Sequence, residues 1–301
     1  MRRVKYITLF CLVGVANSLF SADYYWQSMS VNKSFLIPTN WSPSINPSVS
    51  HPPSTVAEFM VRGAQTYGAA EINSDIEMSH GTINAGGGAG GILNIRGGNI
   101  STNRIQSGMR NYAGVINIYG GKIDIVGLTD PSRIAVTGTL RGYYDGVINF
   151  YGGTVTMDHS LQLVGATLNM YNVGTHDEAD DTISSAPMFA RKGPDSHAIK
   201  VQSGILNIKS LGTGLVLNAG DVIYLIEYEG VASTSGFQNV QNDAIITVDG
   251  YEFQFKMSYQ ISSTRRAIAL VAMQAVDTRP KKGTIIMISR NEGVPAREKN
   301  I

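Results

Sequence analysis

Several charged side chains lie close together in the segment 173–198, which interrupts an otherwise repetitive sequence. The run Thr175–Asp181 holds His176 and four carboxylates: Asp177, Glu178, Asp180 and Asp181. Ca²⁺ takes about six to eight oxygen ligands, so these carboxylates are candidate Ca²⁺ ligands on a loop of the kind that often carries binding residues. Their spacing does not follow an ordered Asp-x-Asp-x-Asp-Gly pattern, and a solvated charged loop is the alternative.

Two kinds of polysaccharide chemistry are compatible with the charged residues. In a lyase, Ca²⁺ would acidify a uronate and Arg191 or Lys192 would take its α-proton. In a glycoside hydrolase, two carboxylates about 5–9 Å apart would flank the scissile bond, and the candidates are Asp124, Asp145 and Asp158. Nothing in the sequence fixes the distances between these acids, and scattered surface carboxylates are the ordinary case. No Ser-His-Asp context or nucleophile elbow appears, so no catalytic residue is assigned.

A third set consists of tyrosines and asparagines that recur at equivalent positions. Its members are candidate glycan contacts: Tyr119, Tyr151, Tyr171, Asn117 and Asn149. If successive copies stack about 4.8 Å apart, the rings and amides form a row that could bind a sugar chain. The favoured alternative is that Tyr-on-Tyr and Asn-on-Asn ladders only stabilise neighbouring copies.

These residues belong to near-copies of one motif, Gly-x-[Ile/Leu]-Asn-[Ile/Phe]-x-Gly-Gly, some of them degraded: Gly91–Ile100, Gly114–Val126, Gly146–Met157, Gly165–Tyr171 and Gly204–Lys209. The residues on either side of each asparagine are apolar, so they share one face of a strand and the asparagine lies on the other. A period of two kept in phase predicts one strand per copy with a buried apolar face. Gly81–Ala85 is interpreted as a degenerate first copy of the motif.

The glycine pairs after these strands allow positive φ and a sharp bend. Two geometries fit: a two-residue hairpin between antiparallel strands, or a corner in one coil of a parallel solenoid. Stacked coils place asparagine on asparagine, whereas an antiparallel array has no need to keep one register. The copies begin 23, 32, 19 and 39 residues apart, which suits coils with loop insertions. The sequence therefore favours an all-β fold, a single-stranded parallel β-helix solenoid.

The N-terminal residues 1–22 are predicted to be a signal peptide. A basic start precedes the apolar run Tyr6–Ala16, which is too short to span a bilayer. Small residues for cleavage follow at Ala16–Ser18, with Ala22 as a second choice. The single cysteine of the chain, Cys11, lies inside this run, so we expect a mature protein without disulfides.

The segments outside the repeats differ from them in residue composition and hydrophobic pattern. An aromatic and proline-rich segment would close the N-terminal end with Trp26 and Trp41, unless these form a sugar platform. Asp249-Gly250 between alternating runs predicts a hairpin near the C-terminus. The expected organisation is an N-terminal cap at 23–54, solenoid repeats at 55–214 with a loop insertion at 173–198, an antiparallel β C-terminal cap at 215–275, and an irregular basic tail at 276–301.

Trp26, Asn40–Pro43, Ser54–Phe59 and the glycine–asparagine copies together resemble a bacterial group. It comprises exported β-helix proteins with repeats like those of autotransporter passengers, many with sorting tails of the PEP-CTERM kind. The resemblance covers roughly residues 24–275 and implies a right-handed β-helix on or outside the cell envelope. Gly220–Gly230 is similar to the closing segment of the same group. The tail of this sequence departs from it, because no Pro-Glu-Pro sorting end is present.

The charge balance argues against nucleic acid as a partner. The 24 basic and 23 acidic residues leave a formal net charge of +1, and the sequence shows no basic patch of the kind that binds nucleic acid. We expect an exported, non-enzymatic protein with a structural or adhesive role at the cell surface or outside the cell, where an extracellular or cell-wall polysaccharide is the expected partner. A polysaccharide-active lyase or glycoside hydrolase is the alternative. The sequence predicts no transmembrane span in the mature chain and no cofactor besides Ca²⁺, and leaves the oligomeric state open.

Overall fold

The computed structural model describes the following parts of the chain: residues 21–28, 31–44, 47, 56–78, 81–87, 90–109, 111–127, 139–174, 186–191, 197–232 and 236–274. These parts consist mainly of strands in three sheets, with a short helix, α1 (Ala64–Tyr67), and a 3₁₀ turn (Pro38–Asn40). The predicted all-β class is therefore confirmed. The predicted basic tail, 276–301, lies outside the described residues.

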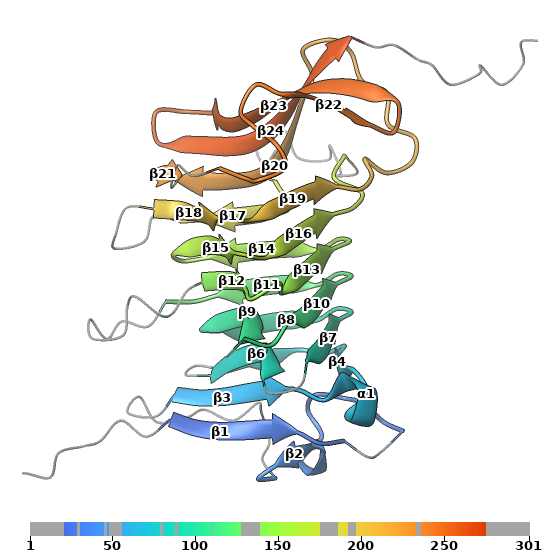
Figure 1. Ribbon diagram of the computed structural model, residues 1–301, viewed down its shortest axis with the longest axis vertical. Coiled ribbons are helices and arrows are strands. Elements are labelled where there is room, and N and C mark those ends of the chain that lie inside the picture. Colours follow the sequence, from blue (N-terminus) through green and yellow to red (C-terminus); the bar gives the residue numbers. More distant parts are fainter. Residues whose placement is uncertain are drawn as a thin grey trace, which may run out of the picture.

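The three sheets, here named A, B and C, run side by side along the long axis of the molecule (Figure 1). Sheet A has the order β2 (Trp41–Ser42), β1 (Ser21–Trp26), β3 (Val56–Val61), β6 (Gly81–Gly87), β9 (Arg104–Met109), β12 (Thr139–Tyr143), β15 (Ser160–Val164), β18 (His197–Gln202) and β21 (Val231–Ala232). Sheet B has the order β4 (Ala70–Ile72), β7 (Gly91–Ile95), β10 (Gly114–Ile118), β13 (Val147–Phe150), β16 (Thr167–Met170) and β19 (Ile205–Ile208).

Sheet C begins at the same end of the molecule and finishes in a set of longer strands. Its order is β5 (Ile76–Glu77), β8 (Asn99–Thr102), β11 (Lys122–Ile125), β14 (Thr154–Met157), β17 (Met188–Ala190), β20 (Val222–Glu229), β24 (Arg265–Gln274), β23 (Tyr251–Gln260) and β22 (Ile245–Val248). From β4 to β21 the chain visits sheets B, C and A in turn, and each return adds a strand beside the previous one. We call one such passage a rung. The arrangement is compatible with the predicted β-helix.

The glycine pairs are corners between sheets B and C. The strands that flank Gly120-Gly121 are β10 and β11, which lie in different sheets, so the hairpin alternative is wrong. The second glycine of each pair has positive φ, which is 94° at Gly121. Corners also lie directly on one another, because a Cβ added at Gly121 would be 2.7 Å from the carbonyl oxygen of Gly98. Only glycine meets both demands without strain.

Parallel register places equivalent residues of the repeats beside one another. Asn117 of β10 is opposite Asn94 of β7 on one side and Asn149 of β13 on the other, and the row continues through β16 and β19. The interpretation of Gly81–Ala85 as a first copy is wrong, because β6 belongs to sheet A and Asn84 is opposite Gln106. The first strand of sheet B is instead β4, with Glu71 opposite Asn94.

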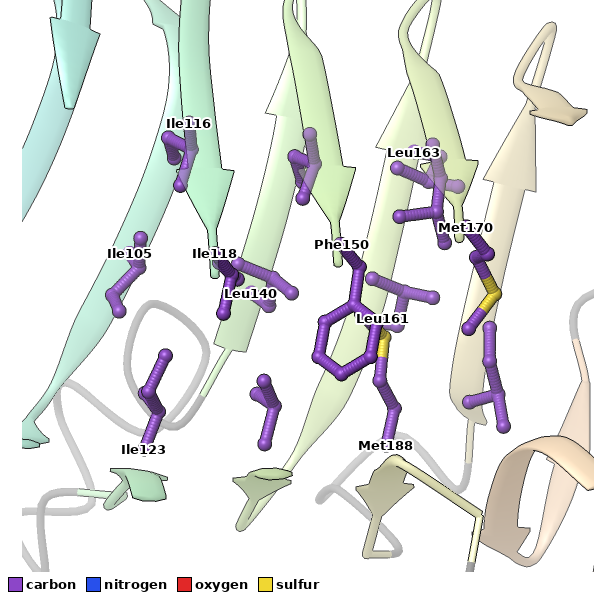
Figure 2. Packing of buried hydrophobic residues seen from close by; sticks show 14 of the residues in the cluster. Ile105, Ile116, Ile118, Ile123, Leu140, Phe150, Leu161, Leu163, Met170 and Met188 are labelled. Atoms are coloured by element: carbon purple, nitrogen blue, oxygen red, sulfur yellow. The ribbon is translucent and has the colours of Figure 1, made fainter. Parts of the chain in front are cut away.

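Apolar side chains from all three sheets meet inside each rung. Figure 2 shows Ile105, Leu140 and Leu161 of sheet A pointing toward Ile118 and Phe150 of sheet B, with residues of sheet C below them. Each of these side chains is at most 2% exposed, so every rung stabilises its neighbours by removing apolar surface from water.

The N-terminal end is closed by aromatic side chains. Trp26 and Trp41 are 0% and 1% exposed, and their indole N–H groups donate to the carbonyl oxygens of Gly68 and Phe35 at 3.2 and 2.8 Å. Such burial excludes the sugar-platform alternative, since neither ring presents a face to solvent. Strand β1 begins at Ser21 and pairs in parallel with β3, so its first two residues fall within the predicted signal peptide 1–22.

The C-terminal end combines parallel and antiparallel pairing. Strand β20 is parallel to β17 on one edge and antiparallel to β24 on the other. Strands β22 and β23 form the hairpin predicted at Asp249-Gly250, where φ is 48° and 82°. The predicted cap 215–275 thus also contributes β20 and β21 to the parallel stack. The predicted insertion 173–198 is not wholly a loop, because it contains β17 and the first residues of β18.

We expect Gly121→Ala to lower the free energy of unfolding by about 1–3 kcal/mol, because alanine is strained at positive φ and its Cβ would meet Gly98. Gly120→Ala is the matched control, since its Cβ would lie 3.4 Å from the nearest atom, the Arg96 carbonyl oxygen. Urea unfolding of both variants measures the difference. Equal stabilities would contradict the corner geometry.

Candidate functional site

The asparagines on the outer face of sheet B form one row of side-chain hydrogen bonds. Each Nδ2 donates to the side-chain oxygen of the rung nearer the N-terminus. The distances are 2.7 Å for Asn94 to Glu71, 2.7 Å for Asn117 to Asn94, 2.8 Å for Asn149 to Asn117, 2.7 Å for Asn169 to Asn149, 2.9 Å for Asn207 to Asn169 and 3.3 Å for Asn239 to Asn207. We call this row the amide ladder. The predicted Asn-on-Asn row is confirmed.

Both ends of the amide ladder carry residues that the repeat motif did not identify. Glu71 accepts from Asn94 with one carboxylate oxygen and from the Nε of Arg96, at 2.6 Å, with the other. This hydrogen bond is the main reason that the pKa of Arg96 is raised. At the far end, Asn239 also donates to the carbonyl oxygen of Leu206 and accepts from its N–H, at 2.7 and 3.1 Å. Asn239 therefore substitutes for a neighbouring strand.

The tyrosines form a second row beside the amide ladder, two residues further along each strand. Tyr119 and Tyr151 stack with ring centroids 4.8 Å apart and planes 9° apart, and Tyr151 and Tyr171 stack at 4.4 Å and 19°. The guanidinium of Arg96 lies 4.9 Å from the centre of the Tyr119 ring. We call these four side chains the tyrosine stack. The predicted Tyr-on-Tyr ladder is confirmed.

Stacking decides what the tyrosines can offer to a ligand. Both faces of Tyr151 are covered by its neighbours, and Arg96 covers the outer face of Tyr119. Sugar rings therefore cannot stack on these faces in the way that carbohydrate platforms use. The edges and hydroxyl groups are what solvent reaches, and Tyr119 is 42% exposed. Burial, together with the neighbouring Tyr171 side chain, raises the pKa of Tyr151.

The predicted Ca²⁺ ligands Asp177, Glu178, Asp180 and Asp181, together with His176 and Lys192, lie outside the described residues. In the part of the chain that the structure describes, no three His, Cys, Asp or Glu side chains gather closely enough to hold a metal ion.

Of the candidate acids for hydrolysis, Asp124 and Asp158 belong to neighbouring strands of sheet C, whereas Asp145 lies elsewhere. Asp158 accepts from the N–H of Gly127 at 3.0 Å and pairs with Arg191 at 3.3 Å, at the end of β14. Asp124 lies within β11 and pairs with Lys122 at 3.1 Å. Asp145 precedes β13, in the turn between sheets A and B. Arg191, the candidate lyase base, is thus committed to an ion pair that ties two rungs of sheet C together.

Comparison of the chain with models of known protein families, with curated proteins and with solved structures gives no match. The resemblance to exported β-helix proteins therefore stays a prediction from the sequence. Across the described ranges, none of the helices has the length and apolar character needed to cross a membrane.

Sheet A carries a buried ion pair that sequence reasoning also missed. Glu58 of β3 accepts from Arg104 of β9 at 3.1 Å, across the intervening strand β6, and the side chain of Arg104 is 7% exposed. Burial lowers the pKa of Arg104, while the charge of Glu58 raises it. The pair joins rungs that are not immediate neighbours, so its evident role is to hold the stack together.

We expect Asn149→Ala to destabilise the protein by about 1–3 kcal/mol, because it leaves the acceptor of Asn117 and the donor of Asn169 unmatched in the middle of the amide ladder. Asn218→Ala is a suitable control, since this exposed asparagine makes only a 3.5 Å side-chain contact. Thermal and urea unfolding compare the two. Similar losses in both variants would show that the ladder contributes nothing beyond an ordinary surface amide.

Proposed function

We propose that the chain is an exported, non-enzymatic β-helix protein with a structural or adhesive role at the cell surface or outside the cell. The observation that carries this proposal is the amide ladder, which runs without interruption from Glu71 to Asn239. It joins every rung of sheet B to the next by the same contact. Such a body is suited to extend away from an attachment point while keeping its shape.

The proposed fold is a single-stranded parallel β-helix with a partly antiparallel C-terminal cap. The regular order of sheets B, C and A and the in-register parallel pairs support this assignment. The right hand of the coil is proposed from the sequence resemblance. Export is proposed from the basic start and apolar run of residues 1–22.

The adhesive part of the proposal concerns the outer face of sheet B, where glycan hydroxyls would meet tyrosine hydroxyl groups. Because both faces of Tyr119 and Tyr151 and one face of Tyr171 are used inside the tyrosine stack, recognition along the row would depend on hydrogen bonds at the ring edges. Tyr151 and Tyr171 present hydroxyl groups one strand apart, a repeat that a linear polysaccharide can follow. The ion pair of Arg191 with Asp158 gives no support to the enzymatic alternative.

We expect Tyr151→Phe and Tyr171→Phe to weaken glycan binding about 3- to 10-fold each, because they remove a hydroxyl donor and keep the stacked ring. Affinity electrophoresis in gels containing pectin or alginate measures this effect. Tyr112→Phe is the control, since Tyr112 is 46% exposed and its ring lies outside the tyrosine stack. Retardation of the Tyr151→Phe and Tyr171→Phe variants equal to that of the wild type would contradict the adhesive role. Release of unsaturated or reducing ends from pectin or alginate by the wild-type protein would contradict the non-enzymatic role.

Export predicts that the N-terminus is trimmed when the full chain is produced in a bacterial host. Mass spectrometry of protein recovered outside the cytoplasm should show a mature start between residues 17 and 23. Cleavage close to Ser18 would leave β1 complete, whereas cleavage after Ala22 would remove its first two residues. Recovery of intact Met1 in the cytoplasm only would contradict the proposed location.

A further inference from the structure

The last strand of sheet B has an edge that is closed in two places and open between them. Asn239 satisfies the N–H and C=O of Leu206, and the carboxylate of Asp249 accepts from the N–H of Leu211 at 2.7 Å. The N–H groups of Ile205 and Lys209 point the other way, toward β16. Alternation along a parallel strand therefore directs the N–H and C=O of Ile208 to the open side. Within the described residues neither group has a partner.

A second open edge belongs to β22, the outermost strand of sheet C. The N–H of Phe255 donates to Ala244 at 2.9 Å, and Ile246 is opposite Phe253. In an antiparallel pair this register turns the backbone groups of Ala244 and Ile246 toward β23 and those of Thr247 away from it. In the described part of the chain, the N–H and C=O of Thr247 likewise have no partner.

The two open edges line the same cavity, which has a volume of about 200 Å³ and includes Ile208 and Thr247 among its walls. Val240, which is 9% exposed, and the partly exposed Ile246 contribute apolar surface to it. Lys209 is an exposed wall residue, and no ion-pair partner for it exists among the described residues. The cavity thus combines the backbone N–H and C=O of one residue on each edge, apolar side chains and the cationic side chain of Lys209.

We propose that this cavity is a docking site for an extended peptide segment of another protein, which adds a short strand between β19 and β22. Backbone pairs at Ile208 and Thr247 fit a main chain, because each offers a donor and an acceptor in one line. Side chains of a strand alternate between its faces. Apolar residues would therefore face Val240 and Ile246, and an acidic residue between them would face Lys209.

The test uses the ¹⁵N-labelled full chain and the peptide acetyl-Ala-Val-Asp-Val-Ala-amide, whose side-chain order is the same in both strand directions. Binding should shift the amide resonances of Ile208 and Thr247 and slow their hydrogen exchange, with no effect at Leu140, which lies in sheet A outside the cavity. N-methylation of both valines leaves the protein unchanged and should weaken binding about 10-fold or more. Equal binding of the methylated peptide, or no shift at Ile208 and Thr247, would overturn the proposal.

Two protein variants identify the groups involved. Thr247→Pro removes the outward N–H without removing a pair to β23, and should abolish the shift at Ile208. Lys209→Glu should weaken the peptide about 3- to 5-fold and leave a peptide with Asn in place of Asp unaffected. Binding that is indifferent to both Thr247→Pro and Lys209→Glu would assign the peptide to another surface. Because the glycan assay concerns the tyrosine stack, the two proposals can fail independently.

Discussion

The structure depends on one register. Parallel pairing sets each asparagine of sheet B beside the asparagine of the next rung, so that a single side-chain amide acts as donor toward one neighbour and acceptor toward the other. A shift of one residue would break the amide ladder and turn the apolar face of that strand outward. The hydrogen bonds and the core therefore specify the same pairing. An alternative register would lose side-chain hydrogen bonds and would also expose apolar side chains to water.

A stack of parallel strands must also end without exposing unpaired edges. The N-terminal end of sheet B is covered by backbone pairing of Glu71 with the segment 33–35, and buried tryptophans close the core beneath it. The C-terminal end is covered in part, by single side chains of Asn239 and Asp249 together with the long antiparallel strands. The two ends are thus closed by different means, one by main chain and aromatic rings, the other by carboxamide and carboxylate groups.

The repeated strands, their inward faces and the rows of asparagine and tyrosine could be predicted because parity and glycine spacing are local properties of the sequence.

The assignment of Asn84 failed because Gly81-Thr-Ile-Asn84 has the same parity in sheet A as the true copies have in sheet B. Its separation of ten residues from Asn94 is too short for a full rung, and that signal could have excluded it. Glu71 and Asn239 could not be found in this way, because one replaces asparagine by a carboxylate and the other lies outside any regular strand. The covered faces of the tyrosines also needed the structure, since the order of residues fixes a row but not how its rings meet.

Because neighbouring rungs of sheet B make the same contacts, a whole unit of the chain could be removed or added without changing those contacts. Residues 114–145 begin at one motif glycine and end just before the next, so their removal would bring Asn94 beside Asn149 with identical partners on both sides. Duplication of the same stretch would insert one further amide in the same orientation. Neither change would remove the residues that close the two ends of sheet B. Removal or duplication of a whole unit would therefore change the span of the molecule while its cross-section stays constant.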